Sequence, residues 1–324
     1  LWDVDGNKYL DMMSAYSAVS HGHSHTELVK VLSDQAQKLA ISSRAFYTEP
    51  FAEYIEKLSK ISKFESVLPM NTGAEAVETA IKAARRWGYF TKGIEINCAE
   101  IIVAEGNFHG RTTTIVGFSS DREYKKGFGP FTEGFIQAEY CSSKCNCSKV
   151  CENSIRSIKN AINKNTCAVI VEPIQGEGGI ITPQSGWLKQ LRELCSESNV
   201  LLILDEIQSG LGRTGKLFAF EHEDIKPDGL ILGKALGGGL LPVSAFLSSK
   251  EVMNHFNPGS HGSTFGGNPL AAKVASKALD LLFEDNLIEN SKVMGAYLKE
   301  KLSEMNHAFI KEIRGKGLWI GVEL

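Results

Sequence analysis

The stretch Val200-Leu201-Leu202-Ile203-Leu204-Asp205 decides the fold that this sequence predicts. Its five apolar residues form a short strand with no polar face, and the strand ends in a carboxylate. A second apolar run, Ala168 to Val171, ends at Glu172. A third run, Leu230 to Gly233, ends at Lys234. Short apolar strands separated by helical stretches are typical of an α/β protein with a mostly parallel sheet that helices cover on both faces.

Local signals predict where the helices around these strands begin. Ser24 and Glu27 have the spacing of a capping box and predict a helix that starts there. Thr72 is the expected N-cap of a helix over 74–90. The other expected elements are a hairpin around Asp5-Gly6-Asn7, a helix from Pro50 to about residue 61, a strand over 101–104, helices over 187–196, from 269 and over 287–305, and a final strand after Arg314-Gly315-Lys316-Gly317.

The composition is that of an ordinary globular protein. Of the 324 residues, 43% are hydrophobic and 23% are charged, which excludes a disordered or fibrous chain. The net charge of -3 leaves no basic surface for nucleic acid, and no apolar run approaches the roughly 20 residues of a membrane helix. We therefore expect neither nucleic acid nor a membrane as a partner. The abrupt apolar ends predict that further residues precede Leu1 and follow Leu324.

Cysteine usage favours an intracellular, reducing compartment, and it does not separate the cytoplasm from the mitochondrial matrix. Three cysteines stand alone, as is usual where thiols stay reduced: Cys98, Cys167 and Cys195. Four others crowd one polar segment: Cys141, Cys145, Cys147 and Cys151. An exposed loop of free thiols is the first expectation for this segment, and a disulfide, a redox switch and a metal site remain open.

Lys234 and Asp205 point to one kind of chemistry. Because ligands bind at the carboxyl ends of parallel strands, both side chains are expected in the same crevice. A lysine in a dry crevice has a lowered pKa, and its free amine forms a Schiff base with an aldehyde. An acid on a neighbouring strand can pair with the protonated nitrogen of a pyridine ring. The two residues together suggest pyridoxal phosphate.

A phosphate site is predicted at the start of the helix that Thr72 caps. Gly73 and Ala74 would offer free backbone N–H groups at the positive end of the helix dipole. Glu75 stands close to the expected anion. The sequence leaves open whether the Glu75 carboxylate turns back to cap the helix.

Eight stretches, in order along nearly the whole chain, carry a resemblance to a known family. They are Ser14–Val19, Ser43–Tyr47, Met70–Ala76, Gly106–Thr112, Val171–Glu177, Asp205–Gly210, Leu232–Leu236 and His261–Pro269. With these stretches the chain resembles the class III, fold-type I pyridoxal-phosphate aminotransferases. Within that class it is most similar to the ornithine aminotransferases, because Tyr16 and the Ser43–Tyr47 stretch match that group.

The resemblance implies a role for each residue around the cofactor ring. Lys234 would form the imine with the cofactor's aldehyde and later carry a proton between substrate and cofactor. Asp205 would hold the ring nitrogen and Gln208 the ring hydroxyl. Phe108 would stack on the ring face. Glu172 is expected to lie buried beside the ring, with no step assigned to it.

The resemblance also implies a phosphate site that two subunits share. Gly73 and Ala74 would donate backbone N–H groups to the phosphate. Ser263 and Thr264 would reach the phosphate of the partner subunit's cofactor. The protein is therefore expected to be a homodimer with shared active sites.

Three further residues would act on the substrate. Arg111 resembles the clamp for a substrate carboxylate, a task suited to its bidentate fork. Glu177 resembles a catalytic acidic gate that pairs with an arginine until an α-carboxylate arrives, and that arginine would lie beyond Leu324. Tyr16 would shape the pocket so that it presents the terminal amine of ornithine.

Histidines offer two further patterns. His21, His23 and His25 alternate as metal ligands can, but the family carries a similar Gly-His-x-His stretch without metal, so a structural role and no metal site are expected. His109 follows Phe108 where relatives often have tryptophan. It could tune the environment of the ring, but we expect it to be simply packed.

The resemblance implies transfer of the δ-amino group of ornithine to 2-oxoglutarate by a ping-pong mechanism, in amino-acid metabolism and specifically proline biosynthesis. The alternatives are another ω-aminotransferase of the class, acting on acetylornithine or 4-aminobutyrate, a cofactor-free Schiff-base lyase that uses Lys234, and a catalytically silent scaffold. The expected domains are an N-terminal segment with a hairpin (1–26), a large domain that binds pyridoxal phosphate (27–285), and the start of a smaller C-terminal α/β domain (286–324).

Overall fold

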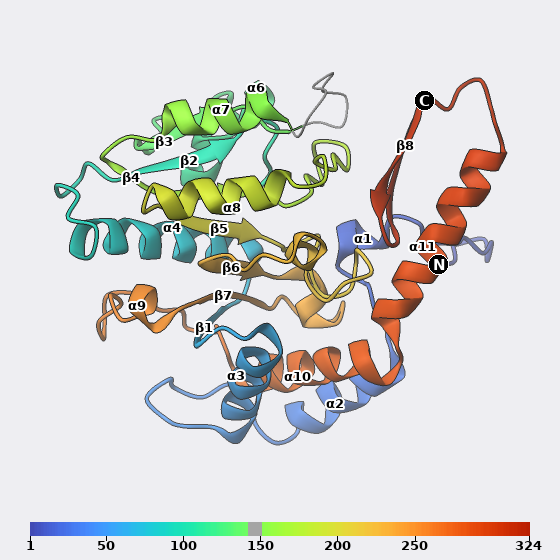
Figure 1. Ribbon diagram of the computed structural model, residues 1–324. Coiled ribbons are helices and arrows are strands. Elements are labelled where there is room, and N and C mark those ends of the chain that lie inside the picture. The colour runs from blue at the N-terminus through green and yellow to red at the C-terminus, as the bar shows by residue number, and fades with distance from the viewer. Residues whose placement is uncertain (142–150) are drawn as a thin grey trace.

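The computed structural model describes residues 1–141 and 151–324, and seven of its strands form one sheet (Figure 1). The strands are β1 (Ser66–Met70), β2 (Glu100–Ala104), β3 (Phe135–Ala138), β4 (Thr166–Val171), β5 (Leu201–Asp205), β6 (Gly229–Leu232) and β7 (Ser244–Ser248). Their order is β1-β7-β6-β5-β4-β2-β3. The strands from β3 across to β6 pair in parallel, and only β7 pairs antiparallel, with β6 and β1. The predicted mostly parallel sheet is confirmed.

Three of the strands have no counterpart among the predicted ones. The edge strand β1 contains Pro69, which interrupts an apolar run and is tolerated at a sheet edge. The other edge strand, β3, has only four residues. In β7, Ser244 and Ser248 shorten the apolar run to three residues, although the whole strand is buried. The short lengths and polar residues of these strands weaken the apolar pattern by which the sequence predicts a strand. Pairing with neighbouring strands holds them in the sheet instead.

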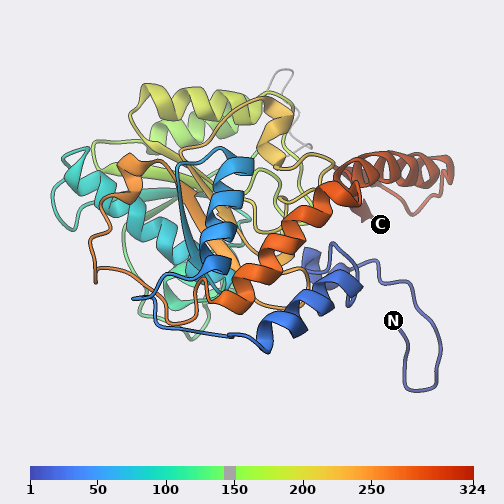
Figure 2. The same ribbon diagram turned by 90° about the horizontal axis from the view of Figure 1, so that it is seen from below.

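Helices cover the two faces of the sheet (Figures 1 and 2). Helix α4 (Gly73–Phe90) packs on one face, and α7 (Glu152–Ala161) and α8 (Trp187–Glu197) pack on the other. Side chains alternate between these faces along each strand. In β5, Ile203 packs in the cluster that contains α4 residues, and Leu204 packs in the cluster of α7 and α8. This alternation directs Asp205 and, at the end of β4, Glu172 to the α4 face.

The remaining helices surround this core. They are α1 (Ser14–Ser17), α2 (Thr26–Ala36), α3 (Glu49–Ser62), α5 (Thr113–Gly117), α6 (Arg122–Lys125), α9 (Lys250–Met253), α10 (Pro269–Glu284) and α11 (Leu287–Glu304), with two short 3₁₀ helices, η1 (Ala219–Glu223) and η2 (Lys234–Gly237). The helices predicted from Pro50, over 74–90, over 187–196, from 269 and over 287–305 are therefore confirmed.

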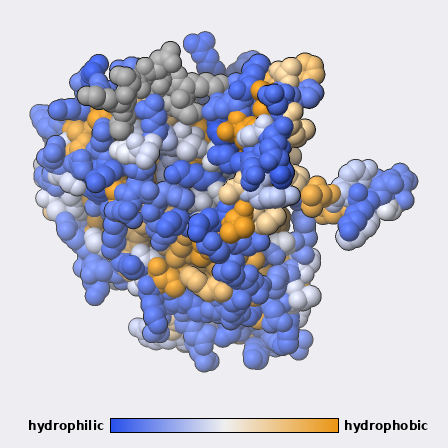
Figure 3. All heavy atoms as spheres, turned by 45° about the vertical axis from the view of Figure 1, so that its right-hand side comes forward, coloured by the Kyte–Doolittle hydropathy of each residue, from blue (hydrophilic) through white to orange (hydrophobic). Residues whose placement is uncertain are grey.

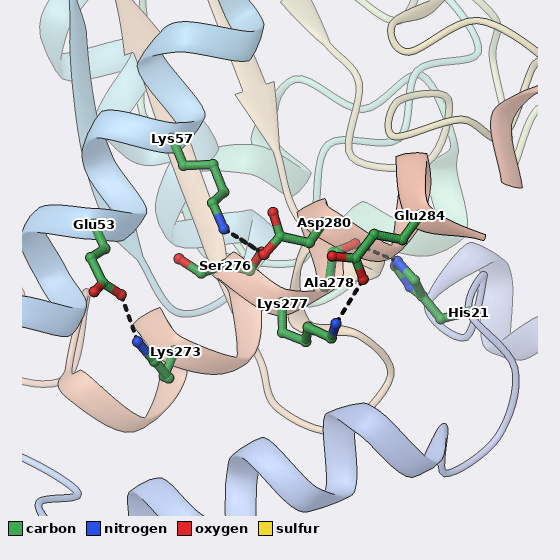
Figure 4. Close-up of polar contacts among 9 residues, drawn as sticks. All are labelled: His21, Glu53, Lys57, Lys273, Ser276, Lys277, Ala278, Asp280 and Glu284. Carbon is green, nitrogen blue, oxygen red and sulfur yellow. Dashed lines mark hydrogen bonds and ion pairs between the residues drawn. The ribbon is translucent and has the colours of Figure 1, made fainter. Parts of the chain in front are cut away.

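Polar contacts attach α10 to its neighbours (Figure 4). Lys57 of α3 donates to Asp280 Oδ2 at 2.6 Å and to the Ser276 carbonyl at 3.2 Å. From the N-terminal segment of the chain, His21 Nε2 lies 2.9 Å from the Ala278 carbonyl. The Lys57–Asp280 pair is partly exposed and contributes at most about 1 kcal/mol. These contacts orient α10, and its buried apolar residues pack it into the core.

One predicted element boundary is wrong, and one predicted strand has an unexpected partner. Helix α2 begins at Thr26 with His25 as N-cap, and Ser24 adopts a positive φ of 50° outside the helix, so Ser24 and Glu27 form no capping box. The final strand predicted after Arg314-Gly315-Lys316-Gly317 is present as β9 (Trp319–Glu323), and Arg314 itself lies within a further strand that was not predicted, β8 (Glu312–Lys316). The two strands pair antiparallel in a separate two-stranded sheet.

The two ends of the chain lie outside the seven-stranded core. The predicted N-terminal hairpin is present, because Trp2 and Lys8 form an antiparallel bridge. Helix α11 and the β8–β9 hairpin extend from the sheet side by side (Figures 1 and 2). The predicted domain boundary at 285/286 falls in the turn between α10 and α11, and the division into domains stays a prediction. None of the helices in the described ranges has the length and hydrophobicity needed to cross a bilayer.

Cys141 and Cys151 are buried free thiols, so the expectation of an exposed loop is wrong for these two residues. Cys145 and Cys147 lie outside the described residues. In the two described ranges, no group of three or more potential ligands could hold a metal ion. Each alternating histidine has its own partner: His21 contacts Ala278, His23 contacts Asp11 and His25 contacts Asp285.

The surface is mostly hydrophilic, with scattered hydrophobic residues on the face that Figure 3 shows. Exposed large apolar side chains are numerous in the N-terminal segment: Leu1, Trp2, Val4, Tyr9, Leu10, Met12, Met13 and Tyr16. Single exposed apolar residues are normal, but a run of this density suggests a surface that another molecule covers.

Candidate active site

A cavity of about 180 Å³ opens where the carboxyl ends of β4, β5 and β6 meet the first turn of α4. Six of the eight residues predicted to bind the cofactor line it: Gly73, Ala74, Phe108, Asp205, Gln208 and Lys234. A larger groove of about 480 Å³ lies at the opposite ends of the strands. Its Arg192 and Asp228 are paired with each other at 2.6 Å. The smaller cavity is the better candidate because it holds an amine that is unpaired among the described residues.

Lys234 supplies that amine. It follows β6 at the start of η2, with a positive φ of 46° that is costly for a residue with a side chain. Among the described residues its ammonium has no hydrogen-bond or ion-pair partner. Burial lowers the pKa of Lys234, and the charges of Asp205, Glu177 and Glu172 only partly oppose this shift. The amine is therefore more readily deprotonated than that of an exposed lysine.

Each carboxylate oxygen of Asp205 has a hydrogen-bond partner. It is 4% exposed, its Oδ1 accepts from the Ile207 amide at 3.0 Å, and its Oδ2 lies 2.7 Å from His109 Nδ1. Because a carboxylate can only accept, His109 Nδ1 carries the proton of this bond. The expectation that His109 is simply packed is wrong. The contact joins residues 96 positions apart, and no local pattern in the sequence could reveal it.

Asp205 in turn changes the pKa of His109. Burial by itself lowers the pKa of His109, but the hydrogen bond and charge of Asp205, with the charge of Glu172, together raise it above its ordinary value. Atom Nε2 of His109 is buried, and within the described part of the chain it has no partner. A proton can therefore reside on His109 beside the Asp205 carboxylate.

Glu172 joins two loops at the edge of the cavity. Its Oε1 accepts from the Phe108 amide at 2.9 Å, and its Oε2 accepts from the Gly176 amide at 3.0 Å. Burial raises the pKa of this carboxyl to about 7. Glu172 thus fixes the loop after β2, which carries Phe108, against the loop after β4.

The first turn of α4 has features that favour an anion. Thr72 Oγ1 accepts from the Glu75 amide at 3.3 Å, and Glu75 Oε2 accepts from the Thr72 amide at 2.6 Å. The Glu75 carboxylate is therefore turned back as a cap, which answers the question that the sequence left open. Gly73 and Ala74 line the cavity, and no hydrogen bond within the described residues occupies their amides. The nearby Ser209 hydroxyl also lines the cavity, is buried and has no partner in the described ranges.

The three predicted substrate residues lie outside the lining of this cavity. The guanidinium carbon of Arg111 lies 4.3 Å from the centre of the Tyr124 ring and 5.5 Å from that of Phe108. Glu177 is exposed and accepts a long hydrogen bond of 3.4 Å from Gln208. Tyr16 is 58% exposed. Their proposed contacts with a substrate stay predictions.

Ser263 and Thr264 also lie outside the cavity. Ser263 Oγ accepts from Asn71 Nδ2 at 2.9 Å, beside the start of α4. Thr264 lines a separate pocket of about 100 Å³ with Arg44 and Phe46. Neither residue is among those that line the cavity of their own chain. The prediction that they serve a partner subunit is untested by the single chain.

Replacing His109 with asparagine should change how stability depends on pH. The asparagine amide can still donate to Asp205 but cannot be protonated. Since folding raises the pKa of His109 above its ordinary 6.5, the protonated ring stabilises the wild type below about pH 6.5, and this contribution is lost as the pH rises through the raised pKa. Urea unfolding of the cofactor-free protein at several pH values measures the difference.

The matching control is His109→Phe, which removes the donor altogether. Leaving Asp205 Oδ2 without this bond should cost about 1–3 kcal/mol at every pH. If wild type and His109→Asn show parallel stability curves from pH 5 to 9, the proton does not reside on His109.

The cavity combines a deprotonatable amine, a buried carboxylate and a helix N-terminus whose dipole favours an anion. Such a set can hold an aldehyde that carries a ring nitrogen and a phosphate. It needs no metal ion, because the amine is the nucleophile and the carboxylate supplies the charge.

Comparisons with known proteins agree with this chemistry. A family model described as aminotransferase class-III matches residues 1–324. The chain is 56% identical over 322 residues to the ornithine aminotransferase of Brevibacillus brevis, covering 99% of this chain and 78% of that protein.

Solved structures give the same fold. The ornithine aminotransferase from Toxoplasma gondii ME49 superposes with a TM-score of 0.95 at 41% identity, over 100% of this chain and 75% of that one. The acetylornithine aminotransferase from Elizabethkingia anophelis superposes with a TM-score of 0.85 at 44% identity, over 99% of this chain and 76% of that one.

Proposed function

The chain belongs to the class-III aminotransferases, which use pyridoxal phosphate, and from this premise we propose that it transfers the δ-amino group of ornithine to 2-oxoglutarate. The observation that carries the proposal is the Lys234 amine, which is unpaired within the described residues and lies beside buried Asp205, in a chain 56% identical to a protein named ornithine aminotransferase. A cofactor-free lyase that uses Lys234 alone does not fit this family.

The residues of the cavity fit pyridoxal phosphate. The open amides of Gly73 and Ala74 suit the phosphate, and the unpartnered Ser209 hydroxyl can add a donor. Asp205 suits the ring nitrogen. When bound, the cofactor supplies an electron-withdrawing ring that stabilises negative charge on the substrate carbon.

The protein's own groups then orient the reactants and move protons. Phe108 would pack on the ring face, and Gln208 would donate to the ring hydroxyl. Lys234 Nζ would hold the cofactor between turnovers and, once free, take a proton from one carbon and return it to another. Its lowered pKa suits this work, because an amine acts as a base only when it is deprotonated. The same residues would serve both half-reactions of a ping-pong cycle.

Direct comparison of amino donors tests the proposal. Ornithine, acetylornithine and 4-aminobutyrate are mixed in turn with the cofactor-loaded protein in the absence of an oxo acid, and the visible spectrum is followed in a stopped-flow instrument. Ornithine should convert the cofactor with the highest second-order rate constant, and 2-oxoglutarate should then restore the original spectrum. Faster conversion by acetylornithine would overturn the choice of donor, and no conversion by any donor would favour a silent scaffold.

One observation favours acetylornithine as the amino donor instead of ornithine. The acetylornithine aminotransferase from Elizabethkingia anophelis is 44% identical to this chain, against 41% for the Toxoplasma gondii ornithine enzyme. Global likeness therefore does not separate the two donors. The 56% identity to the Brevibacillus brevis protein is what favours ornithine.

We also propose a homodimer with shared active sites. Two observations support it: the dense run of exposed apolar side chains in the N-terminal segment, and the position of Ser263 and Thr264 outside the cavity of their own chain. Subunit mixing tests the sharing. A Lys234→Ala chain and a Ser263→Ala/Thr264→Ala chain should together form heterodimers with one intact site, which has both the amine and the partner's hydroxyls. Mixed samples that are no more active than the sum of the two variants would contradict shared sites.

A further inference from the structure

The turn that carries Glu177 is compact and closed. It spans residues 175–181 and is called here the Glu177 turn. The amide of Ile181 donates to the Gln175 carbonyl at 2.9 Å, and the Gln175 amide donates back to the Ile181 carbonyl at 3.1 Å. Inside this bridge, the Ile180 amide donates to the Gly176 carbonyl at 3.0 Å. Such a turn moves as a unit, so an anchor anywhere on it also positions Glu177.

The inner side of the Glu177 turn is attached to the cavity. Gln175 Nε2 donates to the Glu105 carbonyl at 2.6 Å, and the Gly176 amide donates to Glu172 Oε2 at 3.0 Å. At the tip, Glu177 accepts from Gln208, and its charge acts on Lys234. The turn thus holds a negative charge next to the entrance of the cavity.

The outer side of the turn is attached to the β8–β9 hairpin through one side chain. Arg314 Nε donates to the Gly179 carbonyl at 2.8 Å, two residues beyond Glu177. The two residues are 135 positions apart. Backbone also meets backbone here, because a Cβ added to Gly321 of β9 would lie 3.2 Å from the Gly179 carbonyl oxygen.

The guanidinium group of Arg314 is held in place by two carboxylates of its own hairpin. Its Nη1 pairs with Glu323 Oε2 at 2.7 Å and with Glu312 Oε2 at 2.9 Å, and its side chain is only 12% exposed. These bonds set the plane of the guanidinium group, and that plane aims Nε–H at the Gly179 carbonyl. The anchor is therefore rigid, as positioning a charge requires.

We propose that Arg314 is a positioning residue for substrate discrimination, which ties the Glu177 turn to the β8–β9 hairpin and so holds the Glu177 carboxylate beside Gln208 and Lys234. The inference rests on the proposed function, in which ornithine is the amino donor and 2-oxoglutarate is converted to glutamate, which is the donor in the reverse direction. When its δ-amine reacts, ornithine keeps a second cationic group, whereas glutamate carries an additional carboxylate. A fixed negative charge at Glu177 favours the first and repels the second.

The test compares the two donors in single-turnover assays of the cofactor-loaded protein. In Arg314→Met, which keeps the apolar stem but removes the donor, the ratio of kcat/KM for ornithine to that for glutamate should fall about tenfold, a change of about 1.4 kcal/mol. If this variant fails to fold, Arg314→Lys keeps the charge and loses the fork, and the ratio should again fall. Equal losses for both donors would show a merely structural role and overturn the inference.

A double-mutant cycle shows whether Arg314 acts through Glu177. Glu177→Gln alone should lower the ratio, and adding Arg314→Met to it should lower the ratio no further. A full tenfold additional fall in the double variant would overturn the inference. Arg85→Met is the matched control, because Arg85 Nη2 also donates to a backbone carbonyl, that of Glu133 at 2.8 Å, away from the cavity. This control should leave the ratio unchanged.

Hydrogen exchange gives a readout that does not depend on activity. In the cofactor-free protein, Arg314→Met should speed exchange in the peptide that covers 175–181, whereas Arg85→Met should not. Unchanged exchange in Arg314→Met would overturn the anchor itself. This measurement also distinguishes failure of the inference from failure of the proposed function. A wild type that does not use ornithine would contradict the proposed function, while the exchange result would still test whether Arg314 anchors the Glu177 turn.

Discussion

Lys234→Ala should slow amine transfer by roughly a thousandfold, within the range of about 10²–10⁴ that a positioned acid–base group contributes. The reason is that no other amine lines the cavity in the described part of the chain, so no group can replace Nζ as base and as attachment point for the cofactor. Single-turnover conversion by ornithine, followed by absorbance, measures the rate directly.

Lys226→Ala is the control for this prediction. Lys226 Nζ donates to the Lys63 carbonyl at 2.8 Å, in the groove at the opposite ends of the strands. Its loss should leave the rate of amine transfer within about twofold of the wild type. A Lys234→Ala protein that retained a tenth of the wild-type rate would contradict the role assigned to Nζ.

Asp205→Asn should slow amine transfer by roughly a hundredfold, which corresponds to about 2.7 kcal/mol in the activation free energy. The substitution keeps the size of the side chain and removes its charge. A buried carboxylate favours a protonated ring nitrogen, because an opposite charge in a dry site stabilises the cation, and a neutral amide does not. With asparagine at position 205, the ring would therefore withdraw less electron density from the substrate carbon.

Asp228→Asn separates this effect from lost stability. Asp228 Oδ2 also accepts a backbone bond in the sheet, from the Leu202 amide at 2.7 Å, and it pairs with Arg192. Its replacement should lower the midpoint of urea unfolding without slowing the chemical step. If both aspartate variants lost activity only in proportion to their unfolded fraction, the charge of Asp205 would have no part in catalysis.

The sequence by itself determined the parallel core and one end of the site. Apolar runs at β4, β5 and β6 predict buried strands, and the polar residue after each run predicts what lies at the crevice. Thr72 and Glu75 are three residues apart and predict the start of α4. These features are readable because a strand's hydrophobicity and a helix cap depend on neighbours only a few residues away.

Only the tertiary structure decided which side chains meet. The bond from His109 to Asp205 and the bond from Arg314 to Gly179 each join distant segments, and they exist because the strand order and the alternation of faces bring those segments together. The weakly apolar strand β7 likewise owes its place to pairing on both sides. Such contacts depend on how complete elements pack, and packing is a property of the whole chain rather than of any local pattern.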